Sequence, residues 1–136
     1  MKLPKPVNSL FLAILVLFSF SACQRVPVHP VARMLVARNR PQGANHADLF
    51  TMDDTVQFSV SMTWDDVTQN GGFHIVRTNW YKGDTLVSTN QRFALFTKAP
   101  YFWRSWRSAF GLGQGNFKVE ILVDDQSMGS AEFTIQ

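Results

Sequence analysis

The feature that most constrains the fold is the segment 55–64, TVQFSVSMTW, in which apolar and polar side chains alternate. The apolar positions are Val56, Phe58, Val60, Met62 and Trp64, and the positions between them hold Gln, Ser or Thr. Successive side chains of a strand point to opposite faces, so a period of two predicts a β-strand with one buried face. The same alternation returns near the C-terminus, at Phe117, Val119, Ile121 and Val123 and again at Ala131, Phe133 and Ile135.

Other segments extend this pattern into a chain that is mostly β. Residues 73–81 read as a strand, and the turn residues at 82–84 connect it to another over 85–97. Segment 31–38, VARMLVAR, is interpreted as a first strand, with a short helix as the alternative, and 39–54 reads as a loop. The only stretch suited to a longer helix is 103–110. About seven strands with turns roughly every ten residues predict an all-β, two-sheet sandwich.

The C-terminal half also carries a resemblance at the level of fold. Gly115, Phe117 and Val119, followed by Phe133 and Ile135 in the last strand, resemble the paired strands of immunoglobulin-like β-sandwich modules in uncharacterised exported bacterial proteins. The similarity covers residues 56–136. It implies an immunoglobulin-like sandwich, and because such modules share no common chemistry it implies no particular activity.

The N-terminus has the organisation of an export signal. Lys2 and Lys5 precede a run from Leu10 to Phe20 that is apolar except for Ser19. A helix that spans a bilayer needs about 20 apolar residues, so this run is too short to cross. We therefore expect residues 1–22 to be a signal peptide.

The single cysteine of the chain follows this signal directly. Phe20-Ser21-Ala22-Cys23 resembles the lipobox of bacterial lipoproteins, in which the cysteine becomes the acylated first residue of the mature chain. The resemblance implies a lipid anchor on Cys23, and Gln24 after it is similar to the pattern of lipoproteins sorted to the outer membrane. The alternative is an ordinary cleaved signal with an incidental cysteine. We expect a lipidated tether over 23–30 and one β-sandwich domain over 31–136.

The charge of the mature chain says little about a partner. Without Lys2 and Lys5, 11 basic residues face 10 acidic ones, so an exported and nearly neutral chain gives no reason to expect a nucleic-acid ligand. Four arginines precede the first acidic residue, Asp48. They either rest against anionic lipid headgroups or keep the segment solvated. These arginines are Arg25, Arg33, Arg38 and Arg40.

Residues suited to catalysis are present but do not form a recognisable set. His29, His46 and His74 lack the close spacing of metal ligands, and we expect no metal and no cofactor. Three acidic pairs, at 53–54, 65–66 and 124–125, lie at strand ends, where Asp commonly bonds turn backbone. An enzyme would require His74 to meet one of these pairs in space. We expect the protein not to be an enzyme.

The one unusual cluster is KAPYFWRSWRSAF, residues 98–110, where aromatic and cationic side chains interleave. Such a mixture is typical of stacking and interface surfaces, yet Trp103 and Trp106 could instead fill the edge of the sandwich. The candidate binding residues are Tyr101, Trp103, Arg104, Trp106 and Arg107.

Taken together, these features predict a lipoprotein of the cell envelope, anchored by Cys23 in the outer membrane and facing the periplasm. The predicted role is a non-enzymatic accessory module that binds an envelope protein. The alternative role is the binding of a glycan or small ligand through segment 98–110.

Overall fold

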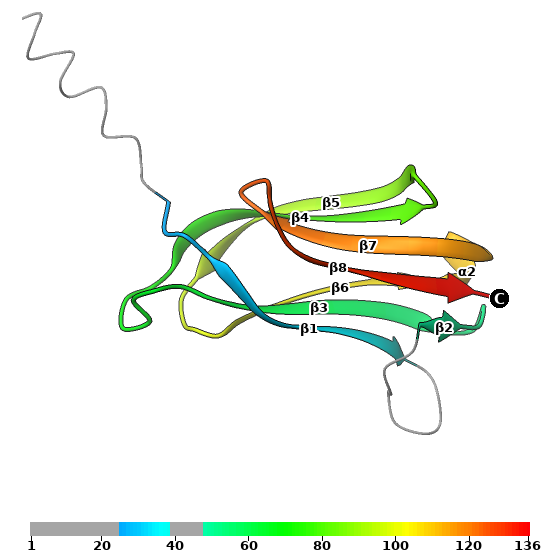
Figure 1. Ribbon diagram of the computed structural model, residues 1–136, viewed down its shortest axis with the longest axis horizontal. Helices are drawn as coiled ribbons and strands as arrows, with labels where there is room; N and C mark the ends of the chain where they lie inside the picture. The colour runs from blue at the N-terminus through cyan, green and yellow to red at the C-terminus, as the bar shows by residue number, and fades with distance from the viewer. Residues whose placement is uncertain (1–24, 39–47) are drawn as a thin grey trace, which may run out of the picture.

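A computed structural model describes residues 25–38 and 48–136 and shows an almost entirely β domain (Figure 1). The elements in chain order are β1 (His29–Arg38), β2 (Leu49–Phe50), β3 (Thr55–Thr63), β4 (Gly72–Lys82), β5 (Thr85–Phe96), β6 (Tyr101–Ser108), α2 (Ala109–Leu112), β7 (Gly115–Val123) and β8 (Gln126–Ile135). The all-β prediction is confirmed, with eight strands among the described residues where about seven were expected.

The strands form two sheets packed face to face. One sheet has the order β1-β3-β6, and the other has the order β2-β8-β7-β4-β5. All pairings are antiparallel except that of β2 with β8, which is parallel. The chain changes sheet five times: from β1 to β2, from β2 to β3, from β3 to β4, from β5 to β6 and from β6 to β7. This is the layout of an immunoglobulin-like β-sandwich.

The core lies between the two sheets and is built from the alternating rows that the sequence displays. Val56, Phe58, Val60 and Met62 of β3 are almost fully buried and face the apolar row of β7. Trp80 of β4 is completely buried, in the place where immunoglobulin-like domains commonly bury a tryptophan. Its ring packs edge-on against Phe133 of β8, with ring centroids 6.0 Å apart.

Two expectations about local structure are wrong. The stretch 103–110 is no long helix, because residues up to Ser108 belong to β6 and only the four residues of α2 are helical. The loop expected over 39–54 contains β2, whose Phe50 is completely buried against Phe133. Segment 31–38 is confirmed as a strand, within β1.

The described part of the predicted tether, residues 25–30, contacts the sandwich. Val28 is only 4 % exposed, and β1 already begins at His29. Arg25 Nη1 donates to Asp124 Oδ1 at 2.7 Å, next to the β7–β8 turn. Residues of the predicted tether therefore contact the sandwich before residue 31, the predicted start of the domain. The predicted signal peptide (residues 1–22), Cys23 and Arg40 lie outside the described residues.

Within the described part of the chain, no helix is long and apolar enough to cross a membrane.

Candidate interaction surface on strand β6

The aromatic and cationic cluster lies on β6, and the strand divides it between two faces. Tyr101, Trp103, Ser105 and Arg107 face the sandwich and are buried or half-buried, whereas the intervening side chains face outward. Trp106 is 58 % exposed and Phe102 60 %. The two tryptophans are three residues apart and so must point to opposite faces of a strand. Trp103 therefore lies on the core side of β6, and Trp106 lies on its outer surface.

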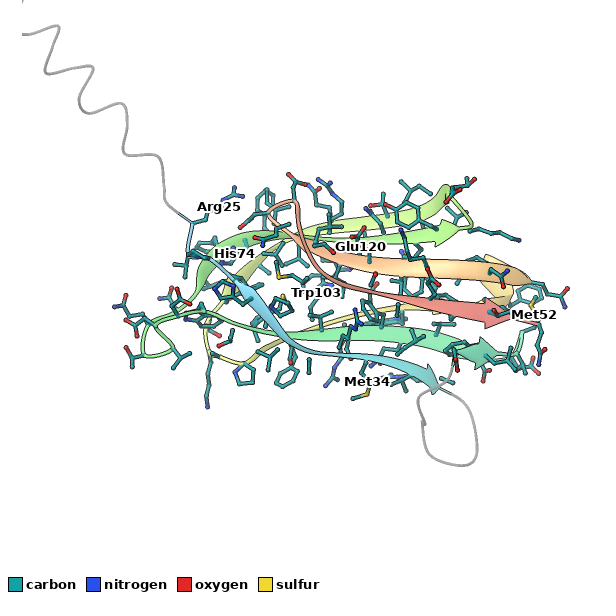
Figure 2. The ribbon with its side chains drawn as sticks, viewed as in Figure 1. Arg25, Met34, Met52, His74, Trp103 and Glu120 are labelled. Carbon is teal, nitrogen blue, oxygen red and sulfur yellow. The ribbon has the colours of Figure 1, made fainter. Side chains whose placement is uncertain are left out.

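The inward side chains of β6 bind the two sheets together. Trp103 Nε1 donates to Thr78 Oγ1 of β4 at 3.2 Å. The Tyr101 ring stacks on Phe96, the last residue of β5, with centroids 4.0 Å apart. Figure 2 shows Trp103 in the middle of the sandwich, between the layers. Tyr101 and Trp103 are thus mainly structural.

Arg107 is also held in place. Its Nε and Nη2 donate to Ser88 Oγ of β5 at 3.1 and 2.9 Å, and its Nη1 donates to the Trp106 carbonyl oxygen at 2.9 Å. The guanidinium lies 5.8 Å from the centre of the Trp80 ring, within the range of a cation–π contact. Arg107 closes the side of the sandwich and has little freedom left to bind a ligand.

The outward side chains form a surface with a floor of small polar residues. The strand register places Phe102 opposite Ser61, Arg104 opposite Ser59 and Trp106 opposite Gln57 of β3. Met34 and Val36 of β1 lie on the far side of β3, opposite Ser59 and Gln57. We call these outward residues the β6 face: Met34, Gln57, Ser59, Ser61, Phe102, Arg104 and Trp106.

Gln57 belongs to this face although it was not among the candidate binding residues predicted from the sequence. It is only 7 % exposed although it points away from the core, and its side-chain Oε1 accepts no hydrogen bond. A buried and unpartnered amide oxygen is costly to a folded protein. The alternation alone would have placed Gln57 in solvent.

A groove of about 270 Å³ lies beside the β6 face, between the edge strands β5 and β6. Three of its lining residues are arginines and none is acidic, so the groove carries positive charge. Arg92 and Arg104 are exposed there, while Arg107 is bonded to Ser88. The lining residues are Asn90, Arg92, Trp103, Arg104, Ser105, Trp106 and Arg107.

A larger hollow, of about 510 Å³, lies near the β4–β5 turn and mixes Asp48, Asp84, Glu132 and Lys118. Its three carboxylates lie with one lysine, and its two aromatic rings, Phe117 and Phe133, are buried, so it offers no exposed aromatic ring for binding. Among the residues that the structure describes, no three His, Cys, Asp or Glu side chains are grouped to hold a metal ion. The β6 face and its groove are therefore the better candidate site.

The structure does bring His74 to an acidic pair. His74 Nδ1 lies 2.7 Å from Asp124 Oδ2, and Asp124 Oδ1 accepts the Ile75 backbone N–H at 2.9 Å. Partial burial by itself raises the pKa of the Asp124 carboxyl. The hydrogen bonds from His74 and Ile75 and the charges of His74 and Arg25 together outweigh burial and leave the pKa below its usual value.

This pair is nevertheless unsuited to acid–base catalysis. His74 Nε2 lies 2.8 Å from the Gly71 carbonyl oxygen, which can only accept, so this nitrogen carries a proton. The ring is 1 % exposed, and both of its nitrogens are engaged with groups of the domain, so a substrate cannot reach either of them. The pair joins β4 to the β7–β8 turn.

The other acidic pairs bond turn backbone, as the sequence predicted. Asp54 Oδ2 accepts from the backbone N–H and the hydroxyl of Thr51. Asp66 Oδ1 accepts from the same two groups of Thr68, and those bonds lower the pKa of its carboxyl.

The two-sheet topology defines the class of protein as an immunoglobulin-like β-sandwich. Comparison with known proteins gives information about the fold and none about the activity. No protein-family model and no curated protein matches the sequence. An immunoglobulin-like protein from Pseudomonas aeruginosa is similar with a TM-score of 0.49 and 5 % identity, over 83 % of this chain and 99 % of that one. A CARDB domain from Pyrococcus furiosus, solved with di-metal ions, gives 0.46 and 9 %, over 81 % and 93 %.

In a third solved structure, the matching region is one part of a longer protein chain. An alkylpurine DNA glycosylase from Pseudomonas fluorescens, bound to DNA with an abasic site analogue, gives a TM-score of 0.52 and 15 % identity. The match covers 88 % of this chain but only 33 % of the glycosylase chain. At such identities the three similarities concern the fold alone.

Proposed function

We propose that this protein is a lipid-anchored, non-enzymatic interaction module of the cell envelope, which binds a protein partner through the β6 face. The anchor is acylated Cys23, and the domain faces the periplasm from the outer membrane. The lipobox-like segment Phe20 to Cys23 supports the anchor, and Gln24 supports the choice of membrane. Residue 25 lies on the surface of the domain, two residues after the proposed site of acylation.

The observation that carries the interaction role is the outward placement of Trp106, Arg104 and Phe102 on one strand. Exposed Trp and Arg side chains supply large contact area and directional hydrogen bonds, which is why they are enriched at interface hot spots. Phe102 and Trp106 lie on either side of Arg104, above a floor of serines. Such a surface suits a partner segment that offers a carboxylate between apolar side chains.

The backbone of β6 adds a second means of recognition. Among the strands that the structure describes, β6 is at the edge of its sheet and pairs only with β3. The open edge of a strand presents unpaired backbone groups, which an extended segment of another protein can pair with. An acidic, extended segment of an envelope protein therefore fits both the edge and the arginine.

The test is site-specific photo-crosslinking in cells that express the full chain. A photoreactive amino acid at position 106 should give a discrete adduct with one envelope protein. The same label at Glu120, on the outer face of the other sheet, is the control and should give none. Arg104→Glu should abolish the adduct at 106. Absence of an adduct at 106 while the protein is folded and acylated would contradict the proposed binding face.

The anchor has its own test, which does not depend on the partner. Intact-mass spectrometry of the membrane fraction should show an N-terminal acylated Cys23, and Cys23→Ser should release the domain into the periplasm. A free thiol on a soluble product would contradict the anchored role and leave the binding role to stand on the crosslinking.

A second candidate function is the binding of an anionic glycan or small ligand in the groove between β5 and β6. The groove favours it, because Arg92 and Arg104 are exposed there beside Trp103 and Trp106. Tryptophan fluorescence should shift on titration with an anionic envelope glycan, and Arg92→Ala should reduce the affinity. An unchanged spectrum at saturating glycan would remove this candidate.

A further inference from the structure

Four apolar side chains gather on the outer face of the five-stranded sheet, far from the β6 face. Phe73 and Leu95 are cross-strand neighbours on β4 and β5, and so are Ile75 and Phe93. Phe93 is 77 % exposed, Phe73 70 % and Leu95 41 %, and Ile75 is half-buried. We call this set the β4–β5 patch. Contiguous exposed aromatic side chains on a small domain commonly mark a contact surface.

The β4–β5 patch lies at the end of the domain where the described chain begins. Figure 1 shows the start of β4 and the end of β5 at the same end as the blue N-terminal segment. Figure 2 shows Arg25 and His74 at that end. Arg25 is bonded to Asp124, whose backbone N–H donates to the Ile75 carbonyl oxygen at 2.9 Å. Ile75 in turn pairs with Phe93.

These contacts set the distance between the patch and the proposed anchor. Adjacent strands are about 4.8 Å apart, so the backbone of Phe93 lies roughly 10 Å from that of Asp124. Position 23 lies two residues before Arg25, a reach of about 7 Å at most. With about 10 Å more for the Arg25 and Asp124 side chains that connect the two segments, acyl chains on Cys23 would enter a bilayer within about 30 Å of the patch.

The charges around the patch are compatible with a lipid surface. Asp124 and Asp125, the nearest acidic residues of the β7–β8 turn, are ion-paired with Arg25 and Arg77 at 2.7 and 3.0 Å. Lys98 is exposed in the loop that follows β5. Paired carboxylates repel anionic headgroups less than free ones do, and exposed cations attract them.

We propose that the β4–β5 patch is a second membrane contact, which seats this end of the domain on the phospholipid bilayer that holds the anchor. The inference rests on the lipid anchor of the proposed function. Phe73, Phe93 and Leu95 would insert at the boundary between headgroups and acyl chains, where aromatic side chains are favourable. The contact fixes the orientation of the domain and turns the β6 face toward soluble or neighbouring proteins.

A bilayer fits this patch better than a second copy of the chain. Four side chains are far fewer than the roughly 20 residues per partner in a stable protein interface. A weak contact suffices next to a lipid anchor, because the anchor makes the second binding event intramolecular.

The experiment uses the full acylated protein in nanodiscs that contain one copy each. Phe93→Cys is labelled with an environment-sensitive fluorophore, and Leu86→Cys is the matched control. Leu86 is exposed on the same strand, seven residues away, or about 23 Å. The label at 93 should shift to the blue and lose at least half of its emission when brominated lipids replace ordinary ones. The label at 86 should remain aqueous and unquenched.

Three outcomes would overturn the inference in different ways. Equal, aqueous spectra at 93 and 86 in a protein with acylated Cys23 would reject the membrane contact and leave the anchor intact. A blue-shifted label at 93 that brominated lipid does not quench would mean that protein covers the patch. A free thiol at position 23, seen by mass spectrometry before labelling, would reject the anchor and the inference with it.

Discussion

Asp124 makes the contacts that join several elements at the end of the domain where the described chain begins. Its carboxylate binds Arg25, His74 and the Ile75 backbone, so it joins the N-terminal segment to β4 and to the β7–β8 turn. Its backbone has a positive φ of 49°, which Asp and Asn tolerate better than most residues do. Substitution by Asn therefore tests the charge without straining the turn.

We expect Asp124→Asn to lower the free energy of unfolding by about 2 to 3 kcal/mol at pH 7. Asn keeps the shape of the side chain but removes the carboxylate that contacts the Arg25 guanidinium, His74 Nδ1 and the Ile75 backbone N–H. Because the folded pKa of Asp124 lies below the value in the unfolded chain, the wild-type advantage is present above about pH 4 and is lost as the pH falls through the folded pKa. Urea unfolding at pH 7 and pH 3 measures both effects.

The control for this prediction is Asp125→Asn in the same turn. Asp125 also has a positive φ, and its side chain is 76 % exposed, so its pair with Arg77 is worth little. We expect a change of less than about 1 kcal/mol at both pH values. Equal effects of the two substitutions would show that the turn, and not the buried pair, determines stability.

The two tryptophans of β6 should separate structure from recognition. Trp103→Ala removes a half-buried ring and a hydrogen bond to Thr78, and we expect a loss of about 2 to 4 kcal/mol. Trp106→Ala removes a mostly exposed ring and should cost less than about 1 kcal/mol while it abolishes partner binding. Thermal unfolding measures the first difference and crosslinking the second. A large loss of stability in Trp106→Ala would assign that ring to the fold.

A substitution at Gln57 tests whether the buried amide of the β6 face lowers the stability of the domain. Its Oε1 is buried without a partner, so Gln57→Met, similar in shape and apolar, should raise the free energy of unfolding by about 1 kcal/mol. Urea unfolding measures the change, and Gln126→Met, at an exposed position, is the control. A decrease in stability would show that the Gln57 amide is satisfied in solution.

At the scale of elements, the sequence predicts the strands that bury one of their two faces in the core. β3 and β7 place every second side chain in the core, so their period of two is visible without a structure. β6 was harder to assign because its Trp103–Trp106 spacing of three also suits a helix. β2 has two residues and is held by its contact with β8, which no local pattern encodes.

β2 offers a prediction of its own. Phe50 is completely buried, and its ring meets Phe133 edge-on with centroids 5.4 Å apart. Phe50→Ala should cost about 3 to 5 kcal/mol, whereas Leu49→Ala, at an exposed neighbour, should cost less than about 1. Amide exchange should rise at Thr134 and Gln136, which donate to the carbonyls of Asp48 and Phe50. Unchanged exchange there would mean that β2 is not held by its phenylalanine.

The sequence predicts which types of residue form the candidate site but not how they are arranged in space. The interleaved aromatic and arginine residues of 98–110 identify the strand that carries it. Which ring faces outward depends on the register of β6 against β3, and the groove depends on Arg92 of β5. The contact of His74 with Asp124 joins residues 50 positions apart, and only the packing of β4 beside β7 brings them together.

At the scale of the whole molecule, the two candidate surfaces lie on opposite layers of the sandwich. The β6 face belongs to the three-stranded sheet, and the β4–β5 patch belongs to the outer side of the five-stranded sheet. A domain that rests on the membrane by the second surface leaves the first accessible. The pair of Arg25 with Asp124 is the link that holds the emerging chain next to the patch.

Arg25→Ala should therefore change the orientation of the domain without changing its stability. Its guanidinium is half exposed, so loss of the pair should cost less than about 1 kcal/mol of folding free energy. The chain between Cys23 and Val28 would then leave the surface and gain reach, and quenching of a label at 93 by brominated lipid should fall. Arg38→Ala, an exposed arginine at the far end of β1, should leave quenching unchanged. Equal quenching in both variants would mean that the anchor and the patch keep this end of the domain at the membrane without the Arg25 pair.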